Sequence, residues 1–237
     1  MEIQSPQLHH ASSRIVTIDE MEAIPAPTGT DTWRPVSHRR VVDAIHAVAL
    51  GKGLSVAKEE YSITRDDARR FGVLKLEAGN GEWSRCIGIR NGNDKTLALG
   101  VAIGVQVYVC DNMCFSGERV FHRRHTANFE VEGVVESAFE GIDVRFDSFE
   151  DRLNTLKGEQ ISHDEAALLI VRVSEEGGVP GSHVMTILKE FTNPRPEEFK
   201  EPTRWNLLNA FTEIGKRYRQ GRYRTFQRTI AEAFQLG

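Results

Sequence analysis

Basic and aromatic side chains alternate near the C-terminal end of the sequence, in a pattern that suits nucleic-acid binding. Six Lys/Arg between residues 216 and 228 interleave with Tyr218, Tyr223 and Phe226. Cationic side chains neutralise phosphates, and aromatic rings stack on unpaired bases. A second basic group follows Gly117. The residues that we predict to contact nucleic acid are Lys95, Arg123, Arg124, Arg217, Tyr218, Arg219, Arg222, Tyr223 and Arg224.

Two polar turns flank an apolar run in the middle of the chain. Residues 91–96 read NGNDKT and residues 111–112 read DN, with glycines at 100 and 104 between them. Asn and Asp bond the local backbone in turns, and glycine allows close approach of a second segment. We favour a structural role for these turns. If both lie at one edge of a sheet, they form a polar pocket of Asn91, Asn93, Lys95, Thr96 and Asn112.

Motifs for catalysis and metal binding are weak. The end of NGNDKT is similar to a phosphate-binding loop, but Asp94 stands where that loop requires glycine. Cys110, Cys114, His122 and His125 could ligate zinc, but the seven residues between Cys114 and His122 are too few for a zinc finger. We therefore predict no catalytic residues, no metal site and no cofactor, and we do not favour an enzyme.

The composition fits a cytoplasmic globular protein. The 237 residues are 40% hydrophobic and 27% charged, and no apolar run approaches the roughly 20 residues of a membrane span. The start of the chain lacks a signal-peptide pattern, and three cysteines fit a reducing compartment. We expect no membrane partner. Charge is uneven, because residues 204–237 carry seven Lys/Arg and two Glu, a net of +5, while the first 203 residues carry −9 of the overall −4.

The pattern of apolar residues predicts an α+β fold with a small antiparallel sheet. Residues 1–32 read as a flexible N-terminal arm, and residues 33–237 as a single α+β domain. Its part 33–125 begins with a helix that Ser37 caps and continues as a meander of three or four strands. We place these strands at 54–63, 71–77, 83–90 and 103–110.

The second part, residues 126–237, is predicted to be mainly helical. Apolar residues at three- and four-residue spacing over 131–156 indicate one long helix, or two joined near Gly141. Ser162 and Glu165 form a capping box that opens the next helix. Glycine and proline interrupt the chain at 177–181 and 193–196, and two final helices follow at about 203–219 and 223–236.

Four motifs occur in an order that resembles a known family. They are WRPV at 33–36, IRNGNDKTLAL at 89–99, VYVCDN through FSG at 107–117, and NLLNAFTE at 206–213. The sequence resembles the uncharacterised phage/plasmid-like protein family, a domain of unknown function carried by prophages, plasmids and phages. The resemblance covers about residues 33–220 and implies an origin in a mobile genetic element. It implies no activity and no catalytic residues.

The order of helix, strand meander and helix is also similar to that of single-strand annealing recombinases, which hold DNA in a basic groove of oligomeric rings. Order of elements does not determine function, and the acidic body of this chain departs from such a groove. We therefore predict a mobile-element accessory protein that binds nucleic acid, with single-stranded DNA as one candidate, without cofactor chemistry. The first alternative is a protein-interaction module, such as a phage counter-defence factor that binds a host protein. The second is a small-molecule enzyme that uses the polar pocket. Self-association into a homo-oligomer is compatible with each.

Overall fold

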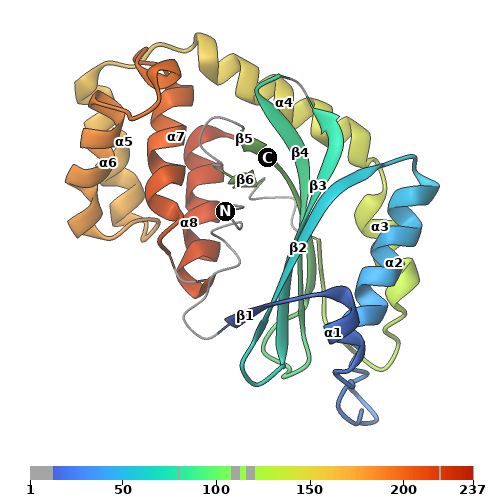
Figure 1. Ribbon diagram of the computed structural model, residues 1–237. Helices are drawn as coiled ribbons and strands as arrows, with labels where there is room; N and C mark the ends of the chain where they lie inside the picture. The colour runs from blue at the N-terminus through green and yellow to red at the C-terminus, as the bar shows by residue number, and fades with distance from the viewer. Residues whose placement is uncertain (1–12, 80, 108–112, 116–120, 219, 237) are drawn as a thin grey trace.

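An antiparallel sheet lies between a helical layer and a helical lobe. The computed structural model describes residues 13–79, 81–107, 113–115, 121–218 and 220–236. Figure 1 shows α2 and α3 along one side of the sheet and the lobe of α5, α6, α7 and α8 on the other side. Helix α4 starts beside α3 and passes over the end of the sheet to the lobe (Figure 1). The predicted α+β fold, with its helix, strand meander and helical second half, is confirmed.

In the described ranges, seven strands form the sheet. They are β1 (Ser13–Val16), β2 (Val56–Thr64), β3 (Arg69–Gly79), β4 (Trp83–Gly92), β5 (Leu99–Val107), β6 (Met113–Phe115) and β7 (Phe121–Arg123). Strands β1 to β6 are neighbours in chain order, β7 also pairs with β5, and every pair is antiparallel. The predicted meander is therefore β2 to β5, and its last strand begins at Leu99 rather than at 103.

Alternation of side chains divides the sheet into two faces. One face carries Leu74, Ile87 and Val101, which belong to the main core with the apolar sides of the helices. The opposite face carries a smaller cluster that includes Phe71 and Phe115. Successive residues of a strand point to opposite faces, so β3, β4 and β6 each supply buried residues to both clusters.

Eight helices accompany the sheet in the described part of the chain. They are α1 (Ile18–Glu22), α2 (His38–Gly51), α3 (Val131–Phe139), α4 (Ile142–Gly158), α5 (His163–Glu175), α6 (Val184–Thr192), α7 (Arg204–Gly215) and α8 (Gln220–Phe234). Ser37 caps α2 by accepting a hydrogen bond from the Arg40 amide, and Ser162 opens α5 with a capping box. Both predicted caps are confirmed. None of the described helices combines the length and apolar character needed to cross a membrane.

Two glycines act as the sequence indicates. Gly141 adopts φ 62°, a left-handed conformation that divides the periodic stretch into α3 and α4. A Cβ added at Gly104 would lie 2.3 Å from the carbonyl oxygen of Cys114, so the close approach of two segments is real. Of the two alternatives for residues 131–156, the structure therefore selects two helices.

Several short elements differ from the prediction. Residues 13–22, within the segment expected to be a flexible arm, form β1 and α1, with Val16 and Met21 buried. Helix α6 occupies the stretch between the two predicted chain breaks, and β6 and β7 were not predicted. Such elements have three to nine residues, which is too few for a reliable periodic pattern. Their partners in the tertiary structure stabilise them.

Candidate nucleic-acid interface

The turn between β4 and β5 holds Lys95 at its tip. Asp94 Oδ1 accepts hydrogen bonds from the Thr96 amide at 3.0 Å and the Thr96 hydroxyl at 2.7 Å. Arg69 Nε donates to Asp94 Oδ2 at 2.5 Å. Burial opposes ionisation of Asp94, but these hydrogen bonds outweigh it and lower the pKa of the carboxyl group. Lys95 has φ 64° and is exposed, so the ordered turn directs its ammonium group outward.

Trp33 lies beneath this ammonium group. Lys95 Nζ is 4.8 Å from the centre of the Trp33 ring, a cation–π distance. Trp33 forms an isolated β-bridge with Thr126, which places the ring beside the segment that follows β7. The ring is half-buried. Sequence reasoning missed Trp33 as a site residue, because 62 positions separate it from Lys95 and no spacing pattern spans that gap.

Arg123 and Arg124 reach the same end of the sheet. Arg123, the last residue of β7, is the cross-strand partner of Leu99, the first residue of β5. Since Leu99 directly follows the turn that carries Lys95, the pairing brings three predicted cations to one end of the sheet. Arg123 and Arg124 are exposed. In the part of the chain that the structure describes, no carboxylate forms an ion pair with either arginine or with Lys95.

The predicted cations of the C-terminal region lie on the helical lobe. Arg217 follows α7 and Arg222 lies in the first turns of α8, and both are exposed. No described carboxylate pairs with them. Arg219 and the side chain of Arg224 lie outside the described residues. These cations form a basic group on the lobe, separate in sequence from the cations at the end of the sheet.

The aromatic residues of this region pack inside the lobe. Tyr218 is only 6% exposed, and its ring stacks on His183 at 5.5 Å and meets Phe226 edge to face at 5.2 Å. Its hydroxyl lies 2.9 Å from His183 Nδ1, and burial raises its pKa to about 12. The hydroxyl of Tyr223 accepts a hydrogen bond from Gln227. We therefore correct the expectation that Tyr218 stacks on bases, because its ring is enclosed.

The predicted polar pocket is brought together only in part. The Nδ2 groups of Asn91 and Asn93 both donate to the carbonyl oxygen of Val36, at 3.3 and 2.9 Å. Both asparagines are buried, whereas Lys95 and Thr96 are exposed at the turn. Asn112 lies outside the described residues. The two asparagines thus join the end of β4 to the segment before α2. The favoured structural role was a hydrogen bond to the local backbone, and it is Asp94 that makes such a bond, to the Thr96 amide.

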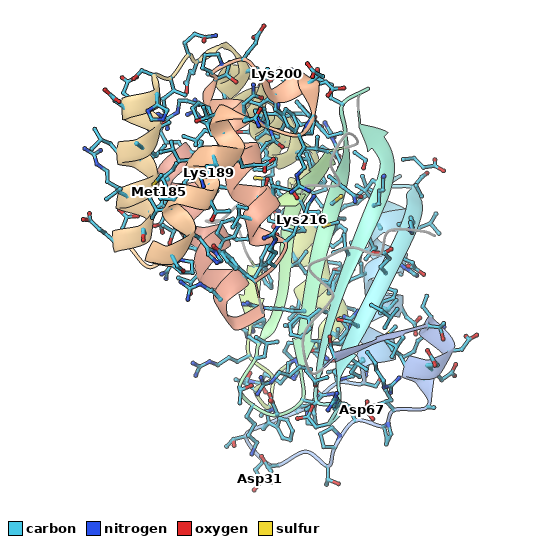
Figure 2. The ribbon with its side chains drawn as sticks, turned by 60° about the vertical axis from the view of Figure 1, so that its left-hand side comes forward. Asp31, Asp67, Met185, Lys189, Lys200 and Lys216 are labelled. Atoms are coloured by element: carbon cyan, nitrogen blue, oxygen red, sulfur yellow. The ribbon has the colours of Figure 1, made fainter. Side chains whose placement is uncertain are left out.

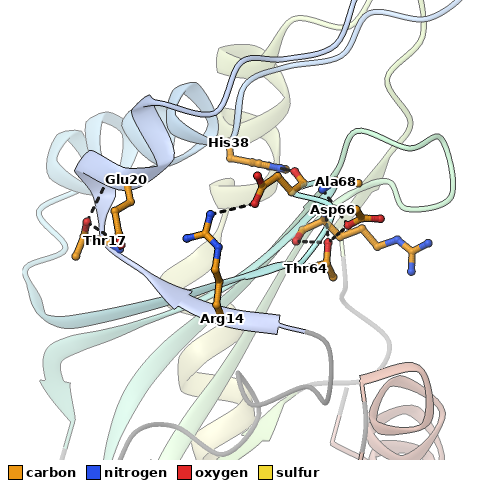
Figure 3. Close-up of polar contacts among 9 residues, drawn as sticks. Arg14, Thr17, Glu20, His38, Thr64, Asp66 and Ala68 are labelled. Carbon is orange, nitrogen blue, oxygen red and sulfur yellow. Dashed lines mark hydrogen bonds and ion pairs between the residues drawn. The ribbon is translucent and has the colours of Figure 1, made fainter.

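His38 extends this buried polar region toward the turn between β2 and β3. Its Nε2 lies 2.9 Å from the carbonyl oxygen of Asp67, and its Nδ1 lies 3.1 Å from Asn91 Nδ2. Figure 3 shows His38 and Arg14 directed at this turn, where Thr64 bonds the carboxylate of Asp66. Burial, with Arg70 nearby, lowers the pKa of His38 to about 4. The ring is therefore neutral at pH 7.

One cleft in the lobe has a volume of about 220 Å³ and lies between the end of α6 and α7. Glu213 lines it and bonds both Arg195, at 3.0 Å, and Lys216, at 2.6 Å. Figure 2 labels Lys216 on the helical lobe and Asp67 at the lower end of the sheet. The charges of this cleft neutralise one another. Within the described ranges, no three His, Cys, Asp or Glu side chains form a group that could hold a metal ion.

A comparison with known families adds one finding. The profile described as "Domain of unknown function (DUF932)" matches residues 28–235, which is most of the chain. No curated protein and no solved structure matches the sequence. The matched range includes the turn with Lys95, strand β7 and the basic part of α8.

Proposed function

We propose that this chain, which belongs to the DUF932 family of unknown function, binds nucleic acid through exposed cations at one end of the sheet and on the lobe. The observation that carries the proposal is the contrast in ion pairing among cations. Lys95, Arg123, Arg124, Arg217 and Arg222 are exposed and have no carboxylate partner among the described residues. Other arginines, such as Arg40 and Arg85, are held by glutamates. Unpaired cations are available to neutralise phosphates.

The sheet end supplies the stronger half of this surface. Three cations lie there, and the half-buried ring of Trp33 lies directly under one of them. A cation beside an aromatic ring suits a single strand, because the phosphate meets the charge and an unpaired base can stack on the ring. Single-stranded DNA is therefore the preferred ligand in our proposal. The resemblance to phage and plasmid proteins supports a mobile-element origin and a place in the cytoplasm.

The test is fluorescence anisotropy with a labelled single strand and a labelled duplex, between about 50 and 200 mM salt. The wild type is compared with the Lys95/Arg123/Arg124→Ala triple variant. If all three cations contact phosphates of a single strand, the slope of log K against log salt should decrease in magnitude by about 2, since each contact contributes about 0.7. A separate Arg217/Arg222→Ala variant measures how much the cations of the lobe contribute to this slope.

A matched control removes the same charge from paired positions. Arg14, Arg40 and Lys200 have exposed side chains that pair with Asp67, Glu132 and Glu197. The Arg14/Arg40/Lys200→Ala variant changes net charge equally, so it should keep the wild-type slope. If both triple variants lost the same amount of slope, the change in net charge alone would explain the effect. Absence of binding by the folded wild type at low salt would refute the proposal.

The acidic part of the molecule favours a second candidate, capture of a basic protein partner. Helices α3 and α4 and the link between them carry exposed carboxylates without an ion-pair partner among the described residues, namely Glu136, Glu140, Asp143 and Asp151. Figure 1 shows these helices along the outer side of the sheet. Such a surface attracts cationic partners. A charge-reversed α3–α4 variant that retains DNA binding but loses a nuclease-resistant partner from host lysate would favour this candidate.

A further inference from the structure

Arg70 is a buried cation whose guanidinium lies over the Tyr61 ring. The residue is 0% exposed, and within the described part of the chain none of its three guanidinium nitrogens has a hydrogen-bond partner. In the described part of the chain no carboxylate pairs with it. Burial lowers its pKa to about 10, with a small opposing effect of Tyr61, so the group keeps its charge at neutral pH. A buried charge normally requires a counter-charge and satisfied hydrogen bonds.

The fold makes room for this guanidinium between the sheet and α2. Arg70 lies on β3 opposite Ile63 of β2 and Asn91 of β4. Its Cζ is 5.5 Å from the centre of the Tyr61 ring, and its Nη1 lies 3.5 Å from where a Cβ of Gly72 would be. The same Cβ would lie 2.5 Å from the Tyr61 ring. Glycine at position 72 therefore provides the space that the ring and the guanidinium occupy.

The polar groups beside Arg70 include no carboxylate that pairs with it in the described part of the chain. His38, at the first turn of α2, and His125 are buried, and burial lowers the pKa of each to about 4. Among the described residues, both ring nitrogens of His125 and the Oδ1 atoms of Asn91 and Asn93 lack hydrogen-bond partners. The N-terminal end of a 14-residue helix adds a partial positive charge on the same side. Asp67 acts electrostatically on His38, and Glu59 accepts a hydrogen bond from the Tyr61 hydroxyl, but neither carboxylate pairs with Arg70. The region is thus only partly hydrogen-bonded, and the charge of Arg70 has no direct counter-charge among the described residues.

We propose that Arg70 binds a small monovalent anion of halide size in the interior of the fold, between β3 and the first turn of α2. The guanidinium donates hydrogen bonds to the anion and provides the counter-charge, and the helix N-terminus favours the same ligand. Chloride is the physiological anion of this size and charge. The inference is independent of nucleic-acid binding, because the residues involved are buried.

Water is the competing occupant. Water molecules could join the guanidinium N–H groups to the free asparagine oxygens, but they would leave the charge of Arg70 uncompensated. The two occupants predict different responses to salt. An anion site saturates with one class of ion and depends on Arg70, whereas bridging water is indifferent to the identity of the anion.

The first test measures thermal unfolding at constant ionic strength while gluconate is replaced by bromide. For the wild type we expect a saturating rise of the midpoint, on the order of 5 °C if bromide reaches about 100 times its Kd. Chloride should act like bromide, and phosphate should not. The Arg70→Met variant should show no saturating rise, while the surface control Arg172→Ala, which changes an exposed arginine of α5, should respond as the wild type does. Parallel responses of wild type and Arg70→Met would overturn the proposal.

The second test needs no variant. Crystals of the wild type grown or soaked in bromide are measured at the bromine absorption edge. An anomalous peak in hydrogen-bonding contact with the Arg70 guanidinium supports the site. Peaks confined to the surface, with only water beside Arg70, overturn it even if Arg70→Met does not fold.

Discussion

Arg85 and Arg70 lie on the same face of the sheet but in opposite electrostatic surroundings. Arg85 on β4 bonds Glu150 at 2.6 Å and Asp147 at 2.7 Å, and its Cζ lies 5.1 Å from the Phe146 ring centre. Arg70 on β3 lies over Tyr61 and has no described carboxylate partner. The aromatic support is alike in the two regions. The difference is the helix above each arginine.

Helix α4 carries carboxylates that face the sheet, whereas α2 does not. Asp147 and Glu150 are three residues apart and therefore lie on one side of α4. The single carboxylate of α2, Asp43, pairs with Arg39 of the same helix at 2.7 Å. The end of the sheet that holds Arg85 is called the paired end. The end that holds Arg70 is called the unpaired end after this arginine alone, because Arg69 pairs with Asp94 there. We infer that the first end stabilises the fold and the second binds anionic ligands.

The largest expected effect on stability follows from removing Glu150, which holds the paired end of the sheet. Glu150 accepts hydrogen bonds from Arg85 and from the buried indole of Trp83. Glu150→Ala leaves both donors without this partner, so we expect a loss of about 3 kcal/mol in the free energy of unfolding. Urea denaturation measures it. Asp147→Ala is the control, because its carboxylate is 66% exposed and should contribute about 1 kcal/mol or less. Equal effects would show that the buried partner is not decisive.

Between about pH 6.5 and 4, acid should destabilise the protein mainly through the buried histidines at the unpaired end. The folded pKa of His38 and of His125 is about 4, and the unfolded value is about 6.5. Between these values the unfolded chain binds more protons, so stability is complete above about pH 6.5 and is lost as pH falls toward 4. Each histidine contributes a slope of up to about 1.4 kcal/mol per pH unit.

This pH dependence can be assigned to one ring. His125→Asn should reduce the slope of unfolding free energy against pH between about 6.5 and 4, relative to the wild type. His163→Asn serves as the control, because His163 is an exposed histidine with a 59% exposed side chain. Urea midpoints over a pH series give the comparison, and the carboxylates titrate alike in all three proteins. An unchanged slope in His125→Asn would contradict the buried, neutral state of this ring.

The smallest effect should have opposite signs at the two ends. Arg70→Met removes an uncompensated charge, so in halide-free buffer we expect a gain of about 1 kcal/mol in the free energy of unfolding. Arg85→Met leaves Glu150 without its arginine and should destabilise the protein. Denaturation of both variants in parallel measures the difference. Destabilisation by both substitutions would remove the distinction between the two ends.

Local signals in the sequence predicted much of the fold. Ser37 and Ser162 identify helix starts, because their hydroxyl groups bond amides only three residues away. The alternating strands β2 to β5 were also found, apart from the displaced start of β5. Residues 13–22 and α6 were missed, since such short segments are stabilised by partners distant in the chain.

Of the candidate site, the sequence predicted the cations but not the aromatic ring beside them. Their types and positions suggested phosphate contacts, but whether a ring beside them is open depends on packing. Tyr218 looks like a stacking residue in the sequence and is enclosed by His183 and Phe226. Trp33 gave no such signal and lies under Lys95.

By itself, the sequence determined the α+β class, the helix caps and the basic C-terminal region, because these follow from neighbours within a few residues. Only the tertiary structure decided which charges are paired. Arg85 meets Glu150 across 65 residues, and Arg70 meets no described carboxylate at all. Charge interacts through space rather than along the chain, so the same residue type is a structural ion pair at one end of the sheet and a proposed anion ligand at the other.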